Sequence, residues 1–171
     1  HWFPKLQAAF PGRLDAVPLD TFYRAIIQVA PSFIRVEADE VTYNLHVMLR
    51  FDIERALVDG SLAATDVPDA WNAAMEDYLG VMPPSDRQGC LQDIHWSIGL
   101  VGYFPTYTLG TLMSAQLFDA ARRDLGDLAD AFARGVYAPL REWLRSHIRA
   151  HGRLYPANAL LSRDCNSAHQ A

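Results

Sequence analysis

Hydrophobic residues recur along most of the chain at the three- and four-residue spacing of an amphipathic α-helix. The longest such pattern runs from Glu37 to Gly60, and its apolar positions are Val41, Leu45, Met48, Leu49, Ile53, Ala56 and Leu57. Glycine commonly ends a helix, and acidic residues favour the first turn. The pattern therefore predicts one long helix that starts near Glu37 and ends near Gly60.

The same spacing predicts five shorter helices. They lie within residues 20–30, 66–80, 106–126, 128–137 and 138–152. Asp20 and Asp66 are suitable N-caps, and Pro31 and Gly80 are suitable stops. The exception is SFIRV at residues 32–36, where alternating β-branched and aromatic residues indicate a brief strand. The expected fold is mainly α, with at most a short β element near 32–36.

Composition narrows the class of protein. A chain of 171 residues, half of them hydrophobic, can bury the core of one domain. The net charge of −5 argues against a nucleic-acid partner or an anionic membrane partner, and no apolar run is long enough to cross a bilayer. Cys90 and Cys165 show no metal-ligand spacing, so we expect reduced thiols in a cytoplasmic protein.

Three sets of side chains could in principle bind metal or react, but their sequence context favours a structural interpretation. His147 and His151 have the spacing of zinc ligands on a helix but lack the glutamate of H-E-x-x-H, and a solvated helix end is preferred. His46 fits a core or boundary residue without a role. Cys90 has no cationic neighbour in the sequence and is predicted to be an inert thiol.

Arg35 and the segment 89–107 carry the remaining candidate chemistry. Arg35 either forms a structural ion pair with Glu37 or Asp39, which its spacing favours, or grips a substrate carboxylate. His95 and the phenols of Tyr103 and Tyr107 either donate hydrogen bonds to a reacting carbonyl or belong to an aromatic core segment with backbone partners. The pattern alone leaves the second pair of alternatives open.

Two motifs connect these residues. Residues 34–39 read I-R-x-x-A-D, and residues 89–96 read G-x-x-Q-D-x-H-W. With these motifs the chain resembles the carboxypeptidase Taq family of zinc metallocarboxypeptidases, from about its first residue to Leu161. The resemblance implies a mostly helical, zincin-like protein with a deep groove, a zinc ion held by H-E-x-x-H and a downstream glutamate, and release of C-terminal amino acids from peptides.

The resemblance also implies how much of such an enzyme is present. In the family the zinc-binding segments precede the stretch with which this sequence begins. Residues 1–161 are therefore expected to be the C-terminal helical portion of the catalytic domain, and residues 162–171 an atypical or truncated tail. No residue of this chain is assigned to the metal, and we expect neither stoichiometric zinc nor hydrolysis from this chain alone.

Residue roles follow from the resemblance. His95 and one of Tyr103 and Tyr107 are assigned to oxyanion stabilisation. Arg35 and Gln92 are assigned to substrate binding, Asp93 and Asp39 to support of the site, and Gln92 also helps Asp93 to orient His95. The expected partner is a peptide C-terminus, and a homodimer is the second partner considered. The alternative is a non-catalytic helical interaction module, in which these residues would lie in separate packed sites.

Overall fold

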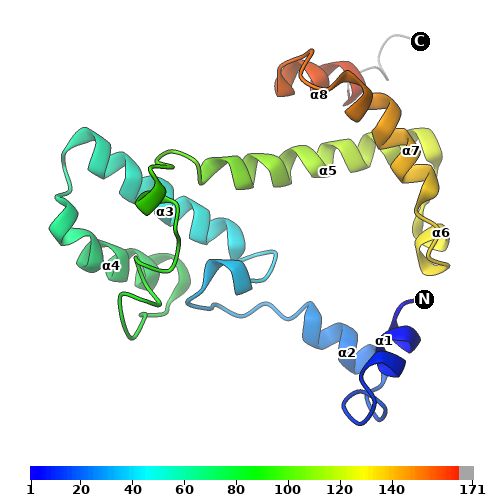
Figure 1. Cartoon of the computed structure of the whole chain (residues 1–171), viewed down its shortest axis with the longest axis horizontal. Coiled ribbons are helices and arrows are strands. Elements are labelled where there is room, and N and C mark those ends of the chain that lie inside the picture. Colours follow the sequence, from blue (N-terminus) through cyan, green and yellow to red (C-terminus); the bar gives the residue numbers. More distant parts are fainter. Residues whose placement is uncertain (166–171) are drawn as a thin grey trace. The chain divides into compact units, whose positions relative to one another are not determined.

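The computed structural model describes residues 1–165, and within that range the chain folds into helices and turns without a strand. The α-helices are α1 (Phe3–Ala9), α2 (Leu19–Ile26), α3 (Tyr43–Asp59), α4 (Val67–Leu79), α5 (Pro105–Leu125), α6 (Ala129–Ala133), α7 (Ala138–His147) and α8 (Ala157–Cys165) (Figure 1). Short 3₁₀ helices are η1 (Arg35–Glu37), η2 (Ala64–Asp66), η3 (Trp96–Ile98) and η4 (Arg149–His151). The predicted mainly α fold is confirmed.

The chain divides into two compact units. One comprises residues 20–109, and the other comprises residues 1–19 together with the chain from Gly110 onward. Helix α5 begins in the first unit and ends in the second. The predicted boundary after residue 161 falls inside α8, and residues 166–171 of the expected tail lie outside the described residues. Every residue assigned to catalysis or substrate binding belongs to the 20–109 unit.

The long helix α3 begins at Tyr43 instead of near Glu37, and it ends as predicted before Gly60, which adopts φ 80°. The late start results from the side chain of Asp39. Its Oδ1 accepts hydrogen bonds from the backbone N–H groups of Val41 and Thr42 at 2.9 and 3.0 Å. This turn satisfies donors that would otherwise be unpaired at the helix N-terminus, and α3 starts after it.

The predicted strand at 32–36 is wrong. Ile34 is extended, but the chain then turns into η1. A strand needs a partner to pair with its backbone groups, and the backbone N–H of Arg35 instead donates to Gln92 Oε1 at 2.8 Å. A distant side chain therefore takes the place of a neighbouring strand.

The other helices follow their predicted limits to different degrees. Helix α4 ends at Gly80 as predicted, but the side chain of Asp66 accepts from the hydroxyl of Thr65 and does not cap the helix. Helix α2 ends at Ile26, short of the predicted end. The helix predicted over 138–152 breaks after His147 and continues only as η4.

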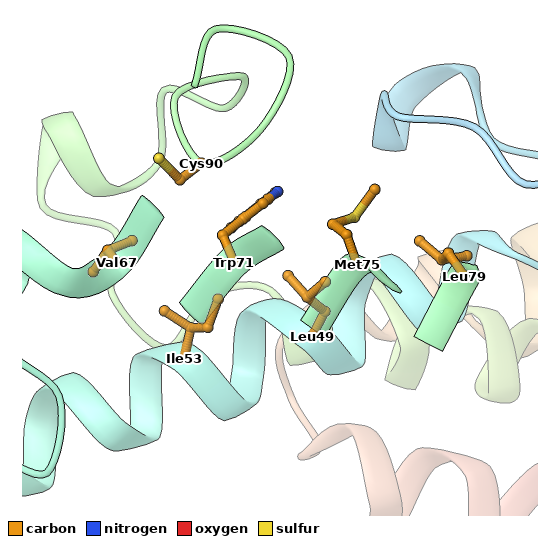
Figure 2. Close-up of a cluster of buried hydrophobic side chains, with 7 residues drawn as sticks. All are labelled: Leu49, Ile53, Val67, Trp71, Met75, Leu79 and Cys90. Atoms are coloured by element: carbon orange, nitrogen blue, oxygen red, sulfur yellow. The ribbon is translucent and has the colours of Figure 1, made fainter. Parts of the chain in front are cut away.

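Helices α3 and α4 pack against each other around the main apolar cluster of the 20–109 unit. Figure 2 shows this cluster, which consists of Leu49, Ile53, Val67, Trp71, Met75, Leu79 and Cys90. The other unit has a smaller cluster, in which Trp143 of α7 packs against two alanines of α5. Among residues 1–165, no helix has both the length and the apolarity that crossing a membrane requires.

Candidate functional site

Helix α3 buries a second face, and this one is polar. His46, Arg50 and Glu54 follow one another at four-residue intervals, and they are 0, 0 and 3% exposed. Residues four apart share one face of a helix, so the three side chains form one row beside the apolar row that faces α4. The sequence pattern does not predict the burial of Arg50 and Glu54, because charged residues at this spacing are usually a solvated pair.

Asp93 lies between two arginines. Arg35 Nη2 donates to its Oδ1 at 2.7 Å. Arg50 approaches its Oδ2 with Nε at 2.7 Å and Nη2 at 2.6 Å. Burial disfavours the ionised carboxylate, but the two guanidinium groups more than offset this and lower the pKa of Asp93. Two cations therefore share one anion in a largely buried cluster.

Burial also lowers the pKa of Arg50, to about 10, although Asp93 opposes the shift. Arg50 therefore remains protonated at neutral pH. With Arg35 and Asp93 also charged, the cluster carries one excess positive charge.

Arg35 is held on several sides. Its Nη1 donates to the hydroxyl of Tyr43 at 2.7 Å, its guanidinium lies 4.9 Å from the ring of Tyr107, and the residue is 4% exposed. The expected ion pair exists, but its partner is Asp93 and not Glu37 or Asp39. Asp39 is engaged elsewhere, because backbone N–H groups of Thr42 and Ala30 stabilise its ionised form and lower its pKa to about 2.

Gln92 joins two segments that are distant in the sequence. Its Nε2 donates to the carbonyl oxygens of Phe33, Gln88 and Gly89 at 2.9, 3.0 and 3.1 Å, while its Oε1 accepts from Arg35. The amide therefore fixes η1 against the turn that precedes Asp93. Its assignment to substrate binding remains a prediction.

His95 completes the cluster. Its Nε2 lies 2.9 Å from the hydroxyl of Tyr107, and its Nδ1 lies 3.7 Å from Asp93 Oδ1 without forming a hydrogen bond. The ring packs on Phe104, with centroids 4.4 Å apart, and the side chain is 12% exposed. The structure thus brings Arg35, Asp93, His95 and Tyr107 together in one cluster.

Tyr103 lies beside this cluster in a different setting. Its ring centroid is 5.8 Å from that of His95, and the residue is 42% exposed. Tyr107 is only partly exposed and makes the contact with the imidazole. The two candidate phenols are therefore distinct in burial and in contact.

Trp96 anchors the end of the G-x-x-Q-D-x-H-W motif. Its indole N–H donates to Glu54 Oε1 at 2.8 Å, and its ring meets that of Trp71 edge to face. An open apolar cavity of about 400 Å³ adjoins Trp96, Glu54 and Cys90. Burial raises the pKa of the Cys90 thiol, which agrees with its predicted inertness.

Among residues 1–165, His46 and His147 do not belong to a group of metal ligands. Burial, together with Arg50 and Arg35, lowers the pKa of His46 to about 4. The backbone of Ser32 opposes this shift weakly, but neither ring nitrogen of His46 makes a hydrogen bond of good geometry. His147 stacks on Trp143 at the end of α7. Within residues 1–165 no three His, Cys, Asp or Glu side chains are grouped so that they could hold a metal ion.

Comparison with known proteins identifies a family profile and several relatives that match this chain. The sequence profile described as Carboxypeptidase Taq (M32) metallopeptidase matches residues 1–171. Thermostable carboxypeptidase 1 of Thermus thermophilus is 45% identical over 171 residues, which are 100% of this chain and 33% of the relative. Carboxypeptidase 1 of Bacillus subtilis is 42% identical over 152 residues, which are 89% of this chain and 30% of the relative.

Solved carboxypeptidase structures also superpose on this chain. The M32 carboxypeptidase of Deinococcus radiodurans superposes with a TM-score of 0.90 at 42% identity, over 96% of this chain and 33% of that structure. Metallocarboxypeptidase 1 of Trypanosoma cruzi gives a TM-score of 0.88 at 41% identity, over 96% of this chain and 34% of that structure. The chain thus spans about a third of the length of these relatives.

Proposed function

The chain belongs to the Carboxypeptidase Taq (M32) metallopeptidase family, and on that premise we propose that it supplies one wall of a peptidase site that releases C-terminal amino acids from peptides. The observation that carries the proposal is the meeting of Arg35, Asp93, His95 and Tyr107 in one cluster. An interaction module without chemistry would not need an imidazole between a phenol and a carboxylate that also pairs with a guanidinium.

His95 and Tyr107 are the proposed donors to the oxyanion of the tetrahedral intermediate. Their Nε2 and Oη atoms lie 2.9 Å apart, so one acceptor atom can be reached by both. The imidazole can also hold or pass a proton at Nε2. Tyr107 is favoured over Tyr103 because it already contacts His95 through its hydroxyl.

Arg35 is the proposed site for the free carboxylate of the substrate. The excess positive charge of the arginine cluster favours an additional anion, and the guanidinium presents its donors in the plane that a carboxylate accepts. Arg35 now contacts Asp93, so an incoming carboxylate would take over part of that contact.

The family metal does not fit the residues of this structure, because residues 1–165 contain no suitable group of ligands. We propose that the zinc implied by the resemblance belongs to segments of the enzyme other than this chain. The chain by itself should then hydrolyse no peptide above background and retain no stoichiometric metal. Peptide-hydrolysis assays with metal analysis test this, and cleavage that His95→Ala abolishes would overturn it.

Carboxylate recognition can be tested on this chain without metal. The probes are N-acetylphenylalanine and its neutral amide, titrated by NMR or calorimetry. We expect the acid to bind at least about tenfold more tightly than the amide, and Arg35→Gln to remove the difference, because only the acid can form the paired contact. Arg24→Gln, which changes an exposed ion-paired arginine, is the matched control. Equal binding of both probes to the unmodified chain would refute the assignment of Arg35.

A further inference from the structure

One oxygen of Asp93 faces two side-chain nitrogen atoms, and only one of them forms a hydrogen bond to it. Arg35 Nη2 donates to Oδ1 at 2.7 Å, while His95 Nδ1 stands 3.7 Å from the same oxygen. The Nδ1 atom is buried and makes no hydrogen bond. A buried ring nitrogen without a partner is unusual, because its desolvation is not compensated.

We infer that Arg35 and His95 compete for Asp93 Oδ1. When a carboxylate draws Arg35 away from Asp93, Oδ1 becomes the hydrogen-bond acceptor of His95 Nδ1. Asp93 is then a positioning residue that links carboxylate recognition to the orientation of the imidazole. The link to a substrate carboxylate rests on the proposed function, whereas the competition itself concerns only residues of this chain.

The exchange of partners requires only a small movement. A hydrogen bond donated by Nδ1–H to Oδ1 needs a distance of about 2.8 Å between the two heavy atoms, so the imidazole and Oδ1 must approach by about 1 Å from their present 3.7 Å. The other oxygen of Asp93 stays anchored, because Arg50 holds Oδ2 with two nitrogen atoms and its side chain is fully buried. Asp93 therefore keeps a cationic partner throughout.

Charge explains why Arg35 would not leave without a replacement. A guanidinium buried without an anion is strongly unfavourable. A carboxylate from the substrate preserves the pairing of Arg35, and Asp93 remains paired with Arg50. The exchange therefore leaves no buried charge alone, and the buried Nδ1 gains the partner that it lacks.

The exchange would also fix the orientation of the imidazole and the direction in which it donates. A ring that donates from Nδ1 to Asp93 is fixed in orientation, and in its protonated form it still donates from Nε2 toward an oxyanion. Ligands without a free carboxylate would leave Arg35 on Asp93 and His95 without this support. The device would thus favour substrates cut at the C-terminus.

The test reads the imidazole of His95 directly by NMR on the ¹⁵N-histidine-labelled chain, with the His95→Gln spectrum for assignment. In Arg35→Gln we expect a Nδ1–H proton of His95 whose exchange with water is slowed at least about tenfold, as a new hydrogen bond requires. Arg35→Lys, which keeps the cation, should resemble the unmodified chain, and Arg24→Gln should change nothing. The backbone spectrum reports whether each variant folds.

A second arm uses the unmodified chain with saturating N-acetylphenylalanine or its amide. The acid should produce the same protected Nδ1–H signal, and the amide should not. If Arg35→Gln folds and its imidazole stays as in the unmodified chain, the competition is overturned. If Arg35→Gln shows the protected Nδ1–H signal but the unmodified chain with bound acid does not, the competition holds and the carboxylate role of Arg35 fails. If the variant does not fold, an absent response to bound acid overturns the inference.

Discussion

The two buried faces of α3 stabilise the molecule in different ways. Leu49 and Ile53 face α4 inside an apolar cluster, whereas Arg50 and Glu54 contact Asp93 and Trp96 through ion pairs and hydrogen bonds. Apolar burial depends on area and tolerates small shifts. Paired buried charges depend on a few distances, and removing one partner leaves the other charge buried and uncompensated. The apolar face therefore fixes the fold, and the polar face fixes the positions of candidate catalytic groups.

The largest expected effect comes from removing the shared anion. Asp93→Asn leaves two buried guanidinium groups without a carboxylate, which should lower the free energy of unfolding by about 3–5 kcal/mol. Urea unfolding measures the change. Asp20→Asn, the same substitution in an exposed pair with Arg24, should leave the midpoint within experimental error. Similar losses at both positions would show that the cluster is not special.

The apolar face should respond differently. Leu49→Ala creates a cavity at a fully buried position and should cost about 3 kcal/mol. Met48→Ala changes its half-exposed neighbour on the same helix and should cost well under half as much. The NMR signals of His95 and Tyr107 should keep their positions in both variants. If Leu49→Ala displaced those signals, the two faces would not act separately.

A third effect concerns pH and His46. This histidine stays neutral in the folded chain down to a pKa of about 4, while in the unfolded chain it titrates near 6.5. As the pH falls from about 6.5 to about 4, only the unfolded state takes up the proton, so stability is lost, on the order of 2–3 kcal/mol. Urea midpoints between pH 7 and pH 4.5 measure this loss. His46→Phe should flatten the dependence, and an equally steep curve in that variant would contradict this assignment.

The smallest effect tests the bond between Trp96 and Glu54. Trp96→Phe removes the donor and leaves both buried oxygens of Glu54 without a hydrogen bond, at a cost of about 1–3 kcal/mol. Trp2→Phe is the matched control, because its indole donates to Tyr137 at an exposed site. Thermal unfolding distinguishes the two variants. Equal shifts would indicate that the buried carboxylate finds another donor.

Helices α3 and α4 were predictable because each buries an apolar face, and the spacing of that face is local in the sequence. The polar row of α3 was not, because Arg50 and Glu54 at four-residue spacing look like a solvated pair until their distant partners are known. The strand at 32–36 failed for the same reason, since Gln92 pairs with the backbone of Arg35 across a long separation.

Within the candidate site, the motifs singled out Arg35, Asp93 and His95, but they did not reveal how these residues pair. The ion-pair partner of Arg35 depends on which acidic side chain the fold brings near it. Asp39 does not pair with Arg35, because it accepts backbone hydrogen bonds in the turn before α3. The choice between Tyr103 and Tyr107 likewise depends on a side-chain contact that spacing does not encode.

The most direct test of the proposed role is the turnover number of a chimera. In the Thermus thermophilus relative, the segment that matches this chain is replaced by this chain, and metal content confirms assembly. His95→Ala should then lower kcat about 100- to 1,000-fold at unchanged metal content, because an oxyanion donor is lost. A kcat that stays within about threefold of the parent chimera, a change worth well under 1 kcal/mol of barrier, would contradict the account.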